Sequence, residues 1–229
     1  MKTITVLSCK GGAGKTTVAV NLAIAGHRAG LKTLLADSDP QRSATLSLQA
    51  RRDPGPDFAA VAAGVLFQQG VVAARDGYDL RVIDTPASPR GDLAQAINCA
   101  DLCLVVCRPT FLDLASVLTS AELIRQLGRS GAVVLNQTQP YRGDVEPASV
   151  RKAIEALKLT GLPLATVVAS RIVYQQSLAH GRSAAEVESW AGDREVASLW
   201  AAAQRLLNDT AFRRQPPRLV AVDGSVRNA

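Results

Sequence analysis

Aromatic residues and long apolar runs are both scarce in this chain of 229 residues. Phe, Trp and Tyr together make up 4% of it, which disfavours the aromatic platforms on which proteins stack the bases of single-stranded nucleic acids. Hydrophobic residues make up 47%, but their runs are about the length of a strand, and none approaches the roughly 20 residues of a membrane-spanning helix. We therefore expect neither a base-stacking platform nor a membrane span.

Cysteine is also sparse, with four residues and no Cys-x-x-Cys pair among them. The four are Cys9, Cys99, Cys103 and Cys107. Cys103 and Cys107 are four positions apart in one continuous apolar run. Because side chains alternate between the two faces of a strand, both should point to the same face of a buried strand. We expect buried free thiols in a reducing compartment, with metal or iron–sulfur ligation as the alternative.

The first residues do not have the pattern of a signal peptide. Lys2 is followed by a strand-like pattern over residues 3–7, whereas export requires an apolar segment and a cleavage site. We therefore expect a cytoplasmic protein.

Acidic residues are outnumbered by basic ones. The chain has 26 Lys and Arg against 20 Asp and Glu, a net charge of +6, and such a surplus favours an anionic partner such as nucleic acid. Because aromatic rings are few, we expect contacts to the phosphate backbone of DNA and not to its bases.

Strand and helix patterns alternate along most of the chain. The predicted strands cover residues 3–7, 32–36, 58–63, 79–84, 101–107, 131–135 and 162–169. The predicted helices cover residues 18–29, 66–75, 89–100, 112–127, 150–157, 170–181 and 194–207. This alternation predicts an α/β fold with a mostly parallel, twisted sheet and helices on both faces. We expect one domain over residues 1–208 and a C-terminal tail over residues 209–229.

A glycine-rich turn joins the first strand to the first helix over residues 8–17. Its glycines allow backbone N–H groups to turn toward an anion, Lys15 can reach the outer phosphates, and the hydroxyl of Thr16 is a ligand for Mg²⁺. The first strand and the helix that follows give this phosphate-binding loop its expected setting.

Carboxylates follow two other predicted strands. Asp37 and Asp39 end the second strand, and Asp84 ends the fourth. Open α/β sheets bind their ligands at the carboxyl ends of strands, so these groups should lie near the loop. For Asp37 a helix cap or turn carboxylate is the alternative.

These motifs resemble those of the ParA/MinD ATPases. Lys10-Gly-Gly-Ala-Gly-Lys15-Thr-Thr is similar to the deviant Walker A box of that family. Asp37-Ser-Asp39-Pro-Gln matches the Asp-x-Asp-Pro-Gln sequence that ends the family's strand after the first helix, and Asp84-Thr-Pro matches its switch II. The resemblance implies a deviant P-loop NTPase that binds ATP and Mg²⁺.

The resemblance also implies roles for individual residues. Lys10, Lys15 and Asp39 would be catalytic, with Lys10 acting on the nucleotide of a facing subunit and Asp39 positioning the attacking water. Thr16, Asp37 and Asp84 would support Mg²⁺. The phosphate cradle would consist of Lys10, Gly11, Gly12, Ala13, Gly14, Lys15, Thr16 and Thr17.

Two further residues are candidate nucleotide contacts. Asn136, near the end of a late strand, can offer a donor and an acceptor to adenine, or can initiate a turn. Asp113 resembles a nucleotide-proximal carboxylate at the family's dimer interface, or can cap a helix.

The resemblance is closest to the short, ParF-like ParA proteins, because the chain starts directly at the first strand. It implies an ATP-bound homodimer that binds double-stranded DNA non-specifically on the nucleoid and segregates a plasmid or chromosome. A ParB-like or other adaptor would stimulate hydrolysis. Candidate DNA contacts are Arg171, Arg205, Arg213, Arg214 and Arg218, and a solvated basic face is the alternative for each.

Other functions remain open. A carboxysome-type positioning ATPase would share every motif. A MinD-like membrane-surface ATPase would need an amphipathic C-terminal helix, which the Pro216-Pro217 pair disfavours. A biosynthetic ligase of the dethiobiotin synthetase type would use the same loop without needing Lys10.

Overall fold

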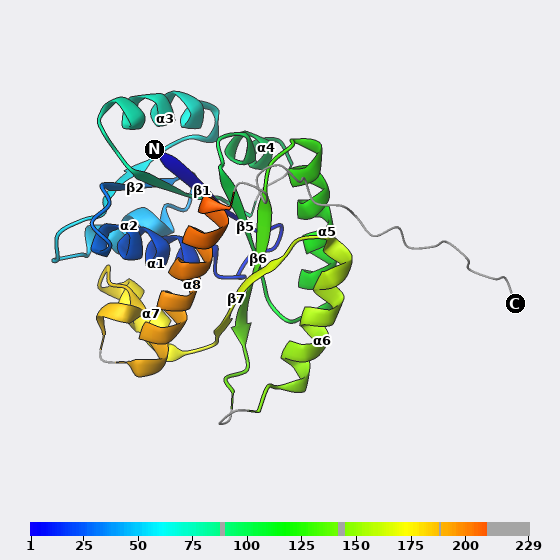
Figure 1. Cartoon of the computed structure of the whole chain (residues 1–229). Coiled ribbons are helices and arrows are strands. Elements are labelled where there is room, and N and C mark those ends of the chain that lie inside the picture. The colour runs from blue at the N-terminus through cyan, green and yellow to red at the C-terminus, as the bar shows by residue number, and fades with distance from the viewer. Residues whose placement is uncertain (88–89, 142–144, 188, 210–229) are drawn as a thin grey trace, which may run out of the picture.

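A seven-stranded sheet forms the centre of the molecule (Figure 1). The computed structural model describes residues 1–87, 90–141, 145–187 and 189–209. The strand order is β3-β2-β4-β1-β5-β6-β7, and every neighbouring pair is parallel. The strands are β1 (Lys2–Leu7), β2 (Thr33–Asp37), β3 (Asp57–Ala60), β4 (Leu80–Asp84), β5 (Leu102–Cys107), β6 (Gly131–Thr138) and β7 (Leu164–Ala169). The α/β fold predicted from the alternating pattern is confirmed.

Helices cover both faces of the sheet (Figure 1). One face carries α1 (Lys15–Arg28), α2 (Ser43–Gln49), α7 (Ile172–Ala179) and α8 (Trp190–Asn208). The other carries α3 (Leu66–Arg75), α4 (Arg90–Asn98), α5 (Phe111–Gln126) and α6 (Ala148–Leu157). Short 3₁₀ turns cover Ala63–Val65, Lys158–Thr160 and Ala184–Glu186.

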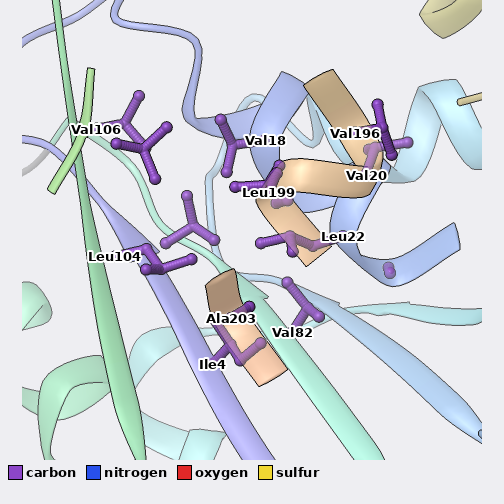
Figure 2. Packing of buried hydrophobic residues seen from close by; sticks show 14 of the residues in the cluster. Ile4, Val18, Val20, Leu22, Val82, Leu104, Val106, Val196, Leu199 and Ala203 are labelled. Carbon is purple, nitrogen blue, oxygen red and sulfur yellow. The ribbon is translucent and has the colours of Figure 1, made fainter. Parts of the chain in front are cut away.

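The central strands are apolar on both sides because both sides are covered. In Figure 2, Ile4, Val82 and Leu104 from three neighbouring strands pack toward the helices that carry Leu22 and Leu199. Alternate residues of β5 face the opposite core, among them Cys103 and Cys107. Both cysteines are free and buried, as predicted, and burial raises the pKa of each thiol to about 12.

The largest difference from the predicted elements is α2, which the sequence pattern did not indicate. Only Ala44, Thr45 and Leu48 of its seven residues are buried, which is too short a stretch to show a helical period. The ends of other elements also differ: β6 runs on to Thr138, α7 begins at Ile172, and α8 begins at Trp190.

The parallel arrangement brings all carboxyl ends of the strands to one edge of the sheet. At this edge Val6 and Asp37 are both in register with Asp84, so the turns after β1, β2 and β4 lie side by side. Within the described residues, no helix combines the length and the apolar character needed to cross a membrane.

Candidate functional site

The glycine-rich loop connects β1 to α1 at this edge. Gly12 and Gly14 have positive φ angles of 73° and 91°, a conformation that side chains with a Cβ rarely adopt. Gly14 is the N-cap of α1, and no described side chain caps the helix there. The first N–H groups of α1 therefore remain available to an anion.

The end of β6 holds the backbone of the loop. Asn136 Nδ2 donates a hydrogen bond to the carbonyl of Ala13, and Gln137 Nε2 donates one to the carbonyl of Gly12, each at 2.8 Å. Because C=O and N–H point in opposite directions across a trans peptide, these two bonds turn the N–H groups of Ala13 and Gly14 away from β6. The packing is tight, since a Cβ on Gly14 would lie 2.2 Å from Asn136 Nδ2.

This contact bears on the two interpretations of Asn136. The strand continues past it to Thr138, so the turn-initiating alternative is wrong. The amide donor is directed at the loop, and a contact with adenine stays a prediction.

Lys15 is the first residue of α1 and is only 7% exposed. With Gly11, Gly12, Gly14 and Thr16 it lines a cavity of about 540 Å³. Burial lowers the pKa of its ammonium, an effect opposed by the nearby carboxylates of Asp84 and Asp39. A buried cation in such a cavity favours an anionic ligand.

Asp84 and Thr16 meet beside this cavity. Thr16 Oγ1 donates to Asp84 Oδ2 at 2.7 Å, while Asp84 Oδ1, which is fully buried, has no hydrogen-bond partner among the described residues. Burial raises the pKa of the Asp84 carboxyl to about 7. A buried carboxylate oxygen without a partner, next to a hydroxyl, fits the donor set of Mg²⁺.

The protein alone does not complete a metal site here. In the described ranges, no group of three His, Cys, Asp or Glu side chains could hold an ion. Mg²⁺ commonly binds through one or two protein oxygens together with water and substrate phosphates. The two side chains therefore fit a metal that arrives with a nucleotide.

Asp37 and Asp39 occupy different environments. Asp37 is buried, and its carboxylate accepts hydrogen bonds from the Asp39 N–H, the Thr45 N–H and the Thr45 hydroxyl. These contacts match the turn-carboxylate alternative, and support of a metal shell remains a prediction. Asp39 lines the cavity beside Lys15, and its Oδ1 accepts from the N–H of Gln41 at 2.9 Å.

Lys10 and Thr17 lie outside the cavity lining. The N–H of Lys10 donates to Ser8 Oγ at 3.2 Å, and its half-buried side chain contacts no hydrogen-bond or ion-pair partner in the described part of the chain. The carbonyl of Thr17 accepts from Asn21 Nδ2 at 2.8 Å, and its contact with phosphate stays a prediction.

Sequence reasoning missed Arg108, which follows β5. Its guanidinium forms an ion pair with the buried Asp113 at 3.1 Å, and its Nη1 lies 3.9 Å from the position of a Cβ on Gly12. Asp113 is not the cap of α5, because Thr110 is the N-cap and accepts the Asp113 N–H. The buried carboxylate thus holds a cation against the loop. The placement of Asp113 at a dimer interface is still a prediction.

The candidate DNA contacts are only partly described. Arg171 Nε donates to Glu195 Oε1 at 2.9 Å, which neutralises part of its charge. Arg205 is exposed on α8. Arg213, Arg214 and Arg218 lie outside the described residues.

Comparisons with known proteins agree with this geometry. The model of the CobQ/CobB/MinD/ParA nucleotide binding domain family matches residues 4–188. The maintenance of carboxysome distribution protein A of Gloeobacter kilaueensis is 36% identical over 170 residues, which is 71% of this chain and 73% of that protein. Protein ParA of Rhizobium radiobacter is 30% identical over 130 residues, 55% of this chain and 57% of that protein.

Solved structures share the fold at low sequence identity. An ATP complex of a substituted variant of Cyanothece McdA has a TM-score of 0.71 at 19% identity, covering 89% of this chain and 96% of that one. The septum site-determining protein MinD of Pyrococcus horikoshii, complexed with Mg-ADP, has a TM-score of 0.70 at 19% identity, covering 90% and 97%.

Proposed function

The chain belongs to the CobQ/CobB/MinD/ParA nucleotide-binding family, and from this premise we propose that it is a positioning ATPase that closes into a homodimer around two ATP molecules. The observation that carries the proposal is the placement of the two lysines of one loop. Lys15 lines the cavity, whereas Lys10 points to no partner in its own described chain. A residue placed in this way is available to the nucleotide of a second subunit.

Each part of the site has a task in hydrolysis. The backbone N–H groups of the loop and Lys15 bind the phosphates, and Thr16 and Asp84 would hold Mg²⁺, which would supply charge neutralisation. Asp39 orients the attacking water from the cavity wall. Lys10 of the facing subunit adds positive charge at the γ-phosphate, where charge develops in the transition state.

Exposed apolar side chains support the closing of two subunits. Phe111 and Leu112 at the start of α5 are 83% and 64% exposed, and Ile172 at the start of α7 is 71% exposed. Both helices begin just after the carboxyl ends of strands, at the edge that carries the loop. A second copy facing this edge would remove these side chains from water.

The cargo is proposed from the relatives and from charge. The match to a carboxysome distribution protein spans more of the chain and is more identical than the match to ParA, so we favour positioning of a protein organelle. Segregation of a plasmid or chromosome is the second candidate. In either case the net charge of +6 supports non-specific binding to DNA, with an adaptor protein stimulating hydrolysis.

Dimerisation tests this function directly. We expect the wild type to change from monomer to dimer on addition of Mg-ATP, as measured by light scattering after gel filtration, and Lys10→Ala to stay monomeric. Lys152→Ala is the matched control, because Lys152 is exposed on α6, which packs on the face of the sheet opposite to α1. Equal dimerisation of the Lys10→Ala variant would remove the basis of the proposal.

DNA binding is tested separately. The ATP-bound dimer should bind a random-sequence duplex, and the affinity should fall steeply as the salt concentration rises because bound counterions are released. Absent or salt-insensitive binding in gel-shift or fluorescence anisotropy experiments would refute the DNA part while leaving the ATPase part intact.

A further inference from the structure

A second pocket, of about 420 Å³, lies between β7 and the first turns of α8. The two elements run side by side at the edge of the sheet (Figure 1). Its floor includes Thr166, Val167 and Ala169 of β7, and its wall includes Trp190, Arg194 and Glu195 of α8. Among the described residues, none lines both this pocket and the nucleotide cavity, so it is a separate site.

The pocket contains two guanidinium groups and one carboxylate. Glu195 accepts hydrogen bonds from Arg171 Nε at 2.9 Å and from the Tyr174 hydroxyl at 2.8 Å, one on each oxygen. Both oxygens of the carboxylate are therefore occupied. Among the described residues, Arg171 donates only this one bond, so its terminal N–H groups remain available at the pocket.

Arg194 has no such carboxylate partner in the described ranges. Its guanidinium lies over the ring of Trp190, 4.6 Å from the ring centre, and Trp190 is 76% exposed. An indole that is exposed to water, next to a cation with no ion-pair partner among the described residues, combines the two residue types, Trp and Arg, that are enriched at the energetic centres of protein interfaces.

We propose that this pocket binds an acidic segment of a partner protein. A carboxylate of the segment would lie between Arg171 and Arg194 and accept hydrogen bonds from both, which are stronger than bonds between neutral groups because both partners are charged. An adjoining apolar side chain would pack on Trp190. The charge of the pocket is complementary to such a segment. A DNA duplex fits less well, because its convex backbone would reach the rim of the pocket and not the floor formed by Thr166, Val167 and Ala169.

The structure also connects this pocket to the phosphate loop. From Leu135 to Thr138, β6 uses three steps where β7 uses two, from Val167 to Ala169, which is a β-bulge. Gln137 lies in this bulge with a φ of 53° and donates to the carbonyl of Gly12, while Thr138 lines the pocket. Thr138 is only 1% exposed but borders the pocket, so a segment bound there would lie one residue along β6 from the side chain that holds the loop.

This connection implies that the bound segment changes the rate of hydrolysis. That part of the inference rests on the proposed function, whereas binding of the segment does not. The two parts can therefore fail independently.

Selection from a displayed library of random peptides on the full chain tests binding. We expect the enriched peptides to carry Asp or Glu beside an apolar residue, and to bind about tenfold more weakly to Arg194→Glu and Trp190→Ala. Arg75→Glu is the matched control, with the same charge change at an exposed position of α3 on the other face of the sheet. Circular dichroism checks that each variant is folded.

Three results would overturn the binding site. The selected peptides could lack acidic residues, or Arg194→Glu could bind the selected peptide with the affinity of the wild type. The variants could also weaken binding of a random DNA duplex while leaving peptide binding unchanged. For the coupling, the selected peptide should change the ATPase rate of the wild type but not that of Gln137→Ala. Binding without any change in rate would remove the coupling and leave the site. An ATPase rate of zero without peptide would instead count against the proposed function.

Discussion

The two ends of the phosphate loop have opposite surroundings. At the inner end, Lys15 is 7% exposed, near two carboxylates, at the start of a helix packed in the core. At the outer end, the half-buried Lys10 follows the exposed Cys9, and no side-chain partner of its ammonium occurs in the described residues. The inner end faces the cavity of its own chain, and the outer end does not. If Lys10 acts on the nucleotide of a facing subunit, as we propose, one chain builds only half of the reaction site.

The largest expected effect is that of Lys10→Ala on hydrolysis. If Lys10 supplies charge to the transition state of a facing subunit, its loss should reduce the ATPase rate about 1,000-fold, the range seen for a cation supplied in trans. The affinity of the monomer for ATP should stay within about twofold, since Lys10 does not line its own cavity. Steady-state rates and titration calorimetry measure the two quantities. A loss of monomer affinity with normal hydrolysis would reverse the assignment of the two ends.

Lys15→Ala should act on binding first. Removing a buried cation from a phosphate site should weaken ATP binding about 100-fold, or about 2.7 kcal/mol, and dimerisation should be lost as a consequence. Fluorescence titration with a labelled nucleotide measures this effect, and Lys152→Ala again serves as the control. If Lys10→Ala and Lys15→Ala weakened ATP binding by the same factor, the two lysines would not have the different roles that we assign to the two ends of the loop.

Asp84, which lies beside the inner end, should also make the stability of the protein depend on pH. The pKa of Asp84 is raised to about 7, so between about pH 4 and pH 7 the folded state binds more protons than the unfolded state does, and its stability falls as the pH rises. At roughly 1.4 kcal/mol per pKa unit, the free energy of unfolding should fall by about 2 kcal/mol from pH 5.5 to pH 7, relative to that of Asp84→Asn.

Urea denaturation in metal-free buffer measures this dependence. Parallel pH profiles of the wild type and the Asp84→Asn variant would show that the carboxyl is not the source. Addition of Mg²⁺ and nucleotide at pH 8 should stabilise the wild type more than the variant, because ligand binding adds to the stability of the folded state.

The smallest effects should come from the two amides that hold the loop. Asn136 is 3% exposed, so Asn136→Ala leaves a buried carbonyl without its donor and should cost about 1–2 kcal/mol of stability. Gln137 is exposed, and Gln137→Ala should cost about 0.5 kcal/mol. Thermal denaturation orders the two. A larger loss of stability for Gln137→Ala than for Asn136→Ala would contradict the view that the loop is held more tightly at Ala13 than at Gly12.

The sequence was sufficient for features that depend on local patterns. The phosphate loop, the free buried thiols of β5 and the carboxylates after β2 and β4 all follow from spacing and parity within short segments. Their roles in catalysis stay predictions. The structure adds a difference between two of these carboxylates. Asp84 has a buried oxygen without a partner among the described residues, whereas both oxygens of Asp37 accept hydrogen bonds.

Features that depend on distant contacts could not be predicted. Asn136 reaches a carbonyl 123 positions away, and Arg108 lies against a glycine of another turn. Neither contact leaves a periodic trace in the sequence. Helix α2 was missed for a related reason, since its start is fixed by Asp37, eight residues before Thr45, and not by a local cap.

That role of Asp37 has a consequence for the timing of each catalytic cycle. One carboxylate anchors the segment that carries Asp39 at both ends, through the N–H of Asp39 itself and through Thr45. The conformational entropy of this segment is therefore lost during folding and not during each encounter with substrate. Under the proposed function, the segment that carries Asp39 therefore needs no ordering step of its own before Asp39 can orient the attacking water.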